Sequence, residues 1–361
     1  YTGDKSAWSV YANEQFALGW GLSALVDLHF QHKQYDFFQQ ATGNFQGALR
    51  NRYQVDYDFF NPKGGLFWQA PGTPLGGELG LYGHFGIAHR EPADSELFDT
   101  WSGPDDLGAQ PLFGTATPIY AGGELQYVYW TDPRVEAEFV RNYEAGFTWR
   151  GASLSLALNG YLMEFQNEVV DYGALDADGQ GVRGNADQTL HRGLELGATG
   201  LLSALPALAE LPGTHRLDVA FARSWDKFER FSFYEADGTR LNLSGNPLAG
   251  VPAHLARIGL DSDWGPLASR FSLRSAGRQY LDVSGRAERR IDGYRVLDIA
   301  FALRPAALGL PSLAGSEIEL KLYNALDVEY ETWGYYDGWG DGNYKVPAAK
   351  SHFLLGVRYD F

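Results

Sequence analysis

The sequence alternates between apolar and polar residues along most of its length, and the pattern is clearest at its end. The apolar or aromatic members there are Phe353, Leu355, Val357, Tyr359 and Phe361. A period of two places them on one face of a β-strand, with Leu354, Gly356, Arg358 and Asp360 on the other. The chain is therefore predicted to be all-β, with one apolar face along each strand.

The same alternation recurs in about thirteen segments of roughly ten residues, a strand length typical of membrane barrels. The segments start near Ser6, Leu22, Tyr53, Glu78, Asn142, Ser153, His191, Thr214, His254, Leu267, Tyr294, Ser316 and Ser351. One segment has Leu297, Ile299 and Phe301 on its apolar side, and Asp298 opposite. A soluble β-sandwich rarely places charge opposite so many apolar faces. A barrel with a polar lumen and a lipid-facing exterior accounts for both faces.

The sequence contains no run of roughly 18–20 apolar residues, which a membrane-spanning helix would need. Its longest Leu/Ala-rich stretch, Leu201–Leu211, is short and interrupted by Pro206. Lipid offers no partner to an unpaired backbone group, so strands that cross a membrane must close into a barrel. Aromatic residues make up 15% of the chain, as interfacial Tyr and Trp girdles require. The predicted fold class is a transmembrane antiparallel β-barrel.

The predicted connections between these strands alternate in length. The short ones are Leu18–Gly21, Ala70–Gly77, Gly151–Ala152 and Gly265–Pro266, with a longer turn at Leu201–Gly213 that is expected to hold a helical turn. The long ones are Gln34–Arg52, Glu91–Arg141, Val169–Leu190, Lys227–Pro252, Tyr280–Gly293 and Glu329–Lys350. Short periplasmic turns and long extracellular loops are the arrangement of bacterial barrels.

Several segments resemble the barrel domain of TonB-dependent receptors, in the family's order along the whole chain. The most specific is the run YNALDVEYE followed by a loop and a terminal aromatic strand, and the next is RNYEAGFTWR followed by NGYLMEFQNEVV. The resemblance implies a 22-stranded barrel filled by an N-terminal plug. Residues 1–361 would be the C-terminal part of that barrel, about its last thirteen strands. The plug and the first strands are absent, and without a signal peptide before Tyr1 we expect a mature form or a fragment.

The resemblance implies an outer-membrane receptor, not an enzyme, that imports a scarce nutrient with energy supplied through TonB. A ferric-siderophore-type iron chelate is the expected substrate. Oligosaccharide, peptide or cobalamin import remains open, as does a non-transporting surface or scaffold protein. The expected partners are outer-membrane lipid, the plug and remaining strands, TonB through the plug, and the barrel-assembly machinery.

Aromatic residues gather in two of the long loops and are the first candidates for ligand contact. The loop Thr332–Pro347 carries Trp333, Tyr335, Tyr336, Trp339 and Tyr344, and the longest loop carries Tyr127, Tyr129 and Trp130. Exposed aromatic rings supply contact area at low entropic cost, which suits planar or sugar-like ligands. The alternative is packing between loops together with an interfacial girdle.

Arginine residues on the predicted polar faces are the second candidates. They are Arg90, Arg150, Arg270, Arg274 and Arg278, of which Arg90 and Arg274 are the preferred ligand-binding residues. They could guide an anionic substrate such as a ferric chelate, or they could pair with carboxylates of the lumen or the plug.

The end of the chain has a further expected role, since Val357, Tyr359 and Phe361 resemble the signal that the barrel-assembly machinery recognises. These residues could equally form a plain lipid-facing strand, and both roles can hold together. No cofactor or metal site is predicted: the histidines are scattered, and Asp176–Gly181 lacks the remaining ligands of a calcium loop. A net charge of −16 argues against nucleic acid as a partner.

Overall fold

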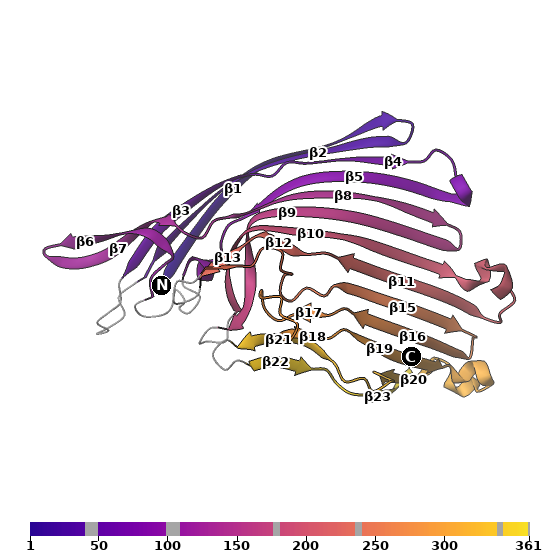
Figure 1. Ribbon diagram of the computed structural model, residues 1–361. Coiled ribbons are helices and arrows are strands. Elements are labelled where there is room, and N and C mark those ends of the chain that lie inside the picture. The colour runs from indigo at the N-terminus through magenta and orange to yellow at the C-terminus, as the bar shows by residue number, and fades with distance from the viewer. Residues whose placement is uncertain (40–49, 99–108, 176–180, 235–239, 338–341, 360–361) are drawn as a thin grey trace.

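The structure, a computed structural model, describes residues 1–39, 50–98, 109–175, 181–234, 240–337 and 342–359 (Figure 1). One curved sheet of 17 strands dominates it, with three further two-stranded sheets. The described helices are all short 3-10 turns, and none is long and apolar enough to cross a membrane.

Thirteen antiparallel strands form the wall when β3 and β4 are counted as one. β3 pairs with the second half of β2 and β4 with the first half, so they are two parts of one wall strand interrupted near Pro62. The wall strands are β1 (Thr2–Gly19), β2 (Leu22–Phe38), β3 (Asn51–Phe60) with β4 (Lys63–Gln69), β5 (Gly77–Arg90), β8 (Glu138–Gly151), β9 (Leu154–Leu175), β10 (Gly181–Leu201), β11 (Thr214–Ser224), β15 (His254–Asp263), β16 (Leu267–Ala276), β19 (Tyr294–Leu303), β20 (Ser316–Tyr323) and β23 (His352–Tyr359). The number and order of the predicted strands are thus confirmed. Among the described residues β1 pairs only with β2, and β23 only with β20, so the wall is a partial barrel with two open edges.

The pairing register confirms the predicted faces. Residues opposite each other on neighbouring antiparallel strands share a face. Ile299 lies opposite Phe271 and Leu322. The same register puts Leu297, Phe301, Leu320 and Leu355 on that apolar face, and Asp298 and Lys321 on the opposite, polar face. A slip of one residue would have exchanged the two sets.

Connections at the two ends of the sheet differ as predicted. Short turns join strands at one end, and Gly19 and Gly21 adopt positive φ in the first of them. The longer turn there holds two 3-10 helices, η3 (Leu202–Ala204) and η4 (Pro206–Leu208), which confirms the expected helical turn. Three more lie at this end: η1 (Pro74–Gly76), η5 (Pro305–Leu308) and η6 (Pro311–Leu313). The opposite end, which carries the long connections, is called the outer end below.

Most of the long connections contain strands of their own, so the expectation that they are simple loops was incomplete. The connection after β5 begins with η2 (Asp94–Leu97) and contains the hairpin β6 (Phe113–Ala121) and β7 (Glu124–Pro133), which joins the main sheet beside β3. The others contain β12 (Lys227–Arg230), β13 (Ser232–Tyr234), β14 (Arg240–Asn242), β17 (Gln279–Tyr280), β18 (Arg290–Ile291), β21 (Glu331–Asp337) and β22 (Gly342–Pro347).

The prediction that Val169–Leu190 forms a loop was largely wrong. β9 runs for 22 residues to Leu175, and β10 starts at Gly181 and runs for 21. Beyond Leu162 the sequence of β9 continues with Glu164, Gln166 and Glu168, so its apolar alternation stops while the strand continues. A strand that extends past the lipid no longer needs an apolar face, and the periodic signal disappears with it.

The polar face becomes apolar at the outer end. On β2 the residues that share a face with Asp27 include Tyr35 and Phe37, which are almost fully buried. They belong to a cluster, called the outer cluster below, of Tyr35, Phe37, Tyr53, Val55, Leu97, Phe98, Ala109, Phe113, Val128, Trp130 and Val135. The connection after β5 thus packs over the polar face of β2 and β3 and replaces water there.

Candidate functional site

Arginine–carboxylate pairs line the polar face of the wall. Arg270 forms a two-point contact with Asp261 on the neighbouring strand, at 2.5 and 2.9 Å. Arg274 lies 3.0 Å from Asp298, and Arg150 lies 3.9 Å from Glu78. These contacts favour the pairing alternative for Arg150, Arg270 and Arg274, because the charge of each is already compensated within the wall.

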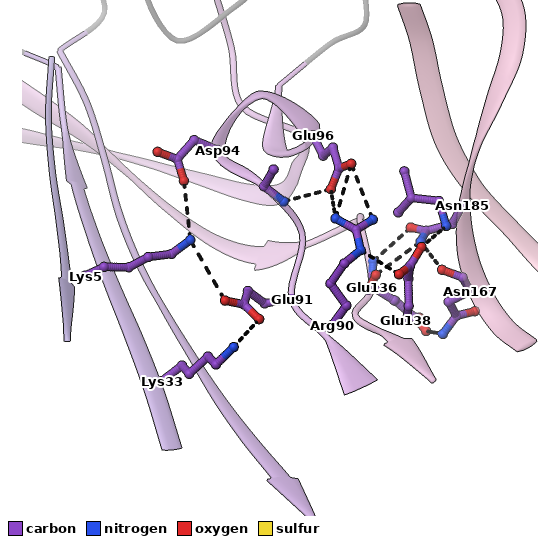
Figure 2. A network of polar contacts seen from close by, with 12 residues as sticks. Lys5, Lys33, Arg90, Glu91, Asp94, Glu96, Glu136, Glu138, Asn167 and Asn185 are labelled. Carbon is purple, nitrogen blue, oxygen red and sulfur yellow. Dashed lines mark hydrogen bonds and ion pairs between the residues drawn. The ribbon is translucent and has the colours of Figure 1, made fainter. Parts of the chain in front are cut away.

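Figure 2 shows how charged residues tie the connection after β5 to the wall. Lys33 on β2 donates a 2.7 Å hydrogen bond to Glu91. Lys5 on β1 lies 4.0 Å from Glu91 and 3.9 Å from Asp94. Burial acts to raise the pKa of the Glu91 carboxyl, but the contacts with Lys33 and Lys5 bring it below its usual value. Glu91 is therefore a carboxylate held between two strands of the wall.

Arg90 anchors the other side of the same segment (Figure 2). Its Nε donates a 2.5 Å hydrogen bond to Glu138 on β8, and its Nη1 lies 3.1 Å from Glu96. Glu96 also accepts a hydrogen bond from the backbone N–H of Ala93, and Glu138 one from the backbone N–H of Val169. Arg90 thus fixes the start of the connection, which favours ion pairing over ligand contact at this residue.

The sequence analysis missed a buried polar cluster at the outer end of β9 and β10. The imidazole of His191 lies between two carboxylates, with Nε2 3.0 Å from Glu168 and Nδ1 3.2 Å from Asp226. Burial is the largest single influence and lowers the pKa of His191, but the two carboxylates together raise it to about 9. His191 is therefore a charged imidazolium at neutral pH. Since its partners lie 23 and 35 positions away, no local sequence motif marks this cluster.

The hairpin β21–β22 brings several of the predicted loop aromatics together. The rings of Tyr335 and Tyr344 stack with centroids 5.2 Å apart, and Trp333 lies 5.6 Å from Tyr335. Trp333 is 52% exposed and Tyr344 50% exposed. These three residues, called the aromatic surface below, leave ring area open to a ligand. Trp339 lies outside the described residues.

The hairpin is held by the neighbouring connection, which carries β17 and β18. The guanidinium of Arg289 lies 3.4 Å from the ring centre of Tyr336 and forms a 2.7 Å ion pair with the buried Asp282. Asn343 donates a 2.8 Å hydrogen bond to the carbonyl of Glu288. Tyr336 is thus a docking residue, whereas the aromatic surface stays open.

The second predicted aromatic group packs into the protein. Trp130 belongs to the outer cluster, and its Nε1 donates a 2.8 Å hydrogen bond to the buried Asn51. Tyr127 lies under the guanidinium of Arg52, and Tyr129 is half-buried opposite Thr117 in the β6–β7 hairpin. This arrangement favours the packing alternative for Trp130.

The terminal strand β23 presents its predicted signal residues along an open edge. Val357 lies opposite Ile318 and is 73% exposed, and Tyr359 lies opposite Ser316. Phe361 lies outside the described residues. Within the described part of the chain, no group of three His, Asp or Glu residues could hold a metal ion. The faint calcium-loop motif falls almost entirely outside that part.

A family model described as "TonB dependent receptor-like, beta-barrel" matches residues 1–325, which is most of the chain. The chain belongs to this family. No curated protein matches this receptor barrel in sequence.

Solved structures of TonB-dependent receptors have the same fold. The ferric yersiniabactin uptake receptor FyuA from Yersinia pestis is 16% identical with a TM-score of 0.65, and the match covers 99% of this chain and 46% of that one. The siderophore receptor PiuA from Acinetobacter baumannii is 16% identical with a TM-score of 0.65, and the match covers 99% of this chain and 43% of that one. The copper transporter OprC is 16% identical with a TM-score of 0.66, over 99% and 48%. This receptor barrel therefore spans about half the length of the structures it matches.

Proposed function

We propose that the complete receptor lies in the outer membrane and imports an iron chelate, with energy supplied through TonB. The observation that carries the proposal is the aromatic surface of Trp333, Tyr335 and Tyr344 at the outer end of a transmembrane barrel wall. Stacked, half-exposed rings suit flat conjugated groups, which are common among the organic ligands that bind iron. Two of the solved structures described above are named as receptors for such chelates.

The wall supplies the second part of the proposal. Its polar face carries arginines paired with carboxylates, which keep the passage polar without a strong net field that would trap an anionic chelate. In the receptor family a plug fills the barrel, and TonB pulls on it. We propose that the plug and the remaining strands complete this wall, and that the receptor performs transport and no catalysis.

Uptake measurements test the proposal. A strain whose receptor gene is deleted and then restored would be supplied with iron-labelled chelates of catecholate, phenolate and hydroxamate type under iron limitation. We expect the restored strain to accumulate iron from at least one of them in a TonB-dependent way. Uptake of copper, cobalamin, an oligosaccharide or a peptide instead would contradict the iron assignment. A receptor that takes up none of these would favour a scaffold role.

A further inference from the structure

A shallow depression of about 570 Å³ lies on the polar face at the outer end of the wall, where it crosses the strands from β9 to β19. Two of its lining residues, Leu255 and Tyr294, lie at or next to the first residues of β15 and β19. Small side chains form its floor, at Ala157, Gly197, Ala220, Ala222 and Ala276. The pairing register brings these positions together, since Gly197 lies opposite both Ala157 and Ala220.

Packing within the protein does not require the glycine at position 197. A Cβ added there would lie 4.0 Å from the Cβ of Ala157, which is an ordinary contact. Gly193 on the same face of β10 differs, because a Cβ there would lie 2.5 Å from the hydroxyl oxygen of Tyr161. A larger side chain would therefore fit at Gly197 and fill the depression, so the space is available to another molecule.

Two arginines lie side by side at the edge of the depression. Arg257 on β15 is directly opposite Arg274 on β16, and both side chains are exposed. Arg274 lies 3.0 Å from Asp298, but among the described residues Arg257 forms no ion pair. Asp261, two residues further along β15 on the same face, already pairs with Arg270. Like charges directly opposite each other on a sheet repel, so this pair favours an anion between the two guanidinium groups.

The depression is continuous with the connection that carries the aromatic surface. The ring of Tyr294 lies 4.4 Å from the ring of Tyr330, centre to centre. Tyr330 immediately precedes β21, on which Trp333 and Tyr335 lie. A ligand that moves from the aromatic surface toward the membrane therefore reaches the depression next.

We propose that the depression is a second site for the imported chelate, on its path along the wall, and that an anionic group of the chelate binds between Arg257 and Arg274. A guanidinium group matches a carboxylate or a pair of phenolate oxygens at two points. Glu195 lines the depression two strands and about 10 Å from Arg257, and its negative charge limits the affinity. A site on a transport path needs such a limit, because the ligand must also leave. The inference rests on the proposed function and narrows the substrate to a chelate with net negative charge.

The first experiment measures how fast two thiol reagents of opposite charge reach the depression, in the complete receptor on energised cells. Ala220→Cys places a thiol opposite Arg257, and residues 1–361 contain no other cysteine. The reagents are the anionic sulfonatoethyl and the cationic trimethylammonioethyl methanethiosulfonates. Tyr120→Cys on the exposed β6–β7 hairpin gives the ratio of their rates in open solution. Relative to that ratio, we expect the anionic reagent to be favoured at least about fivefold at position 220.

Charge variants identify the source of this preference. Arg257→Gln with Arg274→Gln should abolish it, whereas Arg150→Gln, at a paired arginine of the same face outside the depression, should leave it unchanged. The same ratio at positions 220 and 120 would overturn the proposal. The plug is the rival occupant. Protection of position 220 from both reagents would show that the plug covers the depression and would overturn the proposal, as would sensitivity of the double variant to vancomycin, which an intact outer membrane excludes.

The second experiment tests whether the chelate passes through the depression. Gly197→Phe fills it, and Gly356→Phe is the matched control on the polar face of β23, where a Cβ would meet no atom within 4 Å. We expect Gly197→Phe to lower the uptake velocity of an iron-labelled catecholate chelate several-fold, without changing its binding to de-energised cells. Unchanged uptake, or an equal loss in Gly356→Phe, would contradict the passage. Heat-modifiability on gels identifies a Gly197→Phe receptor that fails to fold, and the thiol experiment then decides alone.

The two proposals fail in different ways. A ferric catecholate carries net negative charge, whereas a ferric hydroxamate carries none. Uptake of the hydroxamate alone would contradict the anion site and support the proposed import of iron. Anion-selective labelling at position 220 without uptake of any iron chelate would contradict the proposed function and leave the anion site standing.

Discussion

His191 lies within ion-pair distance of two carboxylates, those of Glu168 and Asp226. The apolar run of β10 ends at Leu194, so this histidine lies beyond the lipid-facing segment, with Glu168 on one side and Asp226 on the other. The contact with Asp226 ties the connection after β11 to the wall. The charge on one imidazole therefore affects how firmly that connection is held.

The stability contributed by His191 should fall as pH rises. Its folded pKa of about 9 lies above the ordinary value of 6.5, so the proton stabilises the folded state fully below about pH 6.5. The contribution declines between these two values and is absent above about pH 9. Its upper limit is about 3 kcal/mol.

Urea unfolding of the complete receptor from pH 6 to pH 10 checks this prediction. We expect the difference in midpoint between wild type and His191→Gln to be largest at pH 6 and to vanish near pH 10. His352→Gln, at an exposed histidine, is the control. A difference that stays constant across the range would show that the two carboxylates do not raise the pKa of His191.

The aromatic surface allows a test of ligand contact at single residues. Tyr335→Ala with Tyr344→Ala removes the stacked pair, and truncation of aromatic hot spots typically costs roughly 2 kcal/mol each. We expect substrate binding by the complete receptor to weaken at least about tenfold, which corresponds to ~1.4 kcal/mol. Tyr120→Ala removes an exposed tyrosine of the β6–β7 hairpin and is the control. Unchanged affinity in the double variant would remove the hairpin from the binding site.

At the scale of elements, the hairpin β6–β7 depends on the outer cluster for its position. Trp130→Ala removes a buried ring and its hydrogen bond to Asn51, and truncations of this kind cost about 3–5 kcal/mol. We expect the connection after β5 to become sensitive to limited proteolysis, while heat-modifiability of the barrel persists. Trp20→Ala, at a fully exposed turn residue, should leave the digestion pattern unchanged. If the connection in the Trp130→Ala variant resists protease, the ion pairs of Arg90 and Glu91 are sufficient to hold the connection in place.

The wall strands could be predicted because each carries its own local signal. Wherever a strand meets lipid on one side, a period of two must appear in its sequence, as in Leu297–Phe301. The outer parts of β9 and β10 have no lipid contact, so nothing in their sequence distinguishes strand from loop. Whether Trp130 packs or stays open depends on Asn51, 79 positions away, and a pattern within one segment cannot show such a contact. The aromatic residues were therefore predictable as candidates, but their separation into packed and open groups was not.

At the scale of the molecule, the described partial barrel has two open edges, at β1 and at β23. We propose that the end of the chain carries the assembly signal, since β23 presents Val357 and Tyr359 along one of those edges. Deleting Phe361 from the complete receptor should lower its amount in the outer membrane several-fold without changing the affinity of the folded pool. Quantitative immunoblots and ligand binding measure the two quantities. Undiminished membrane abundance would contradict the assembly role.

The change in character of the polar face along β2 has a consequence for exchanging binding loops between receptors. Tyr35 and Phe37 belong to the strand in sequence, but they serve the connection after β5 in packing. A chimera cut at the strand ends would give this connection to a host whose wall is built for water at those positions. The buried rings of the transferred connection would then contact polar side chains of the host wall, and the connection would not adopt its native packing. The transferable unit is therefore the connection together with the outer thirds of β2 and β3, so recombination within such barrels should succeed inside strands more often than at their ends.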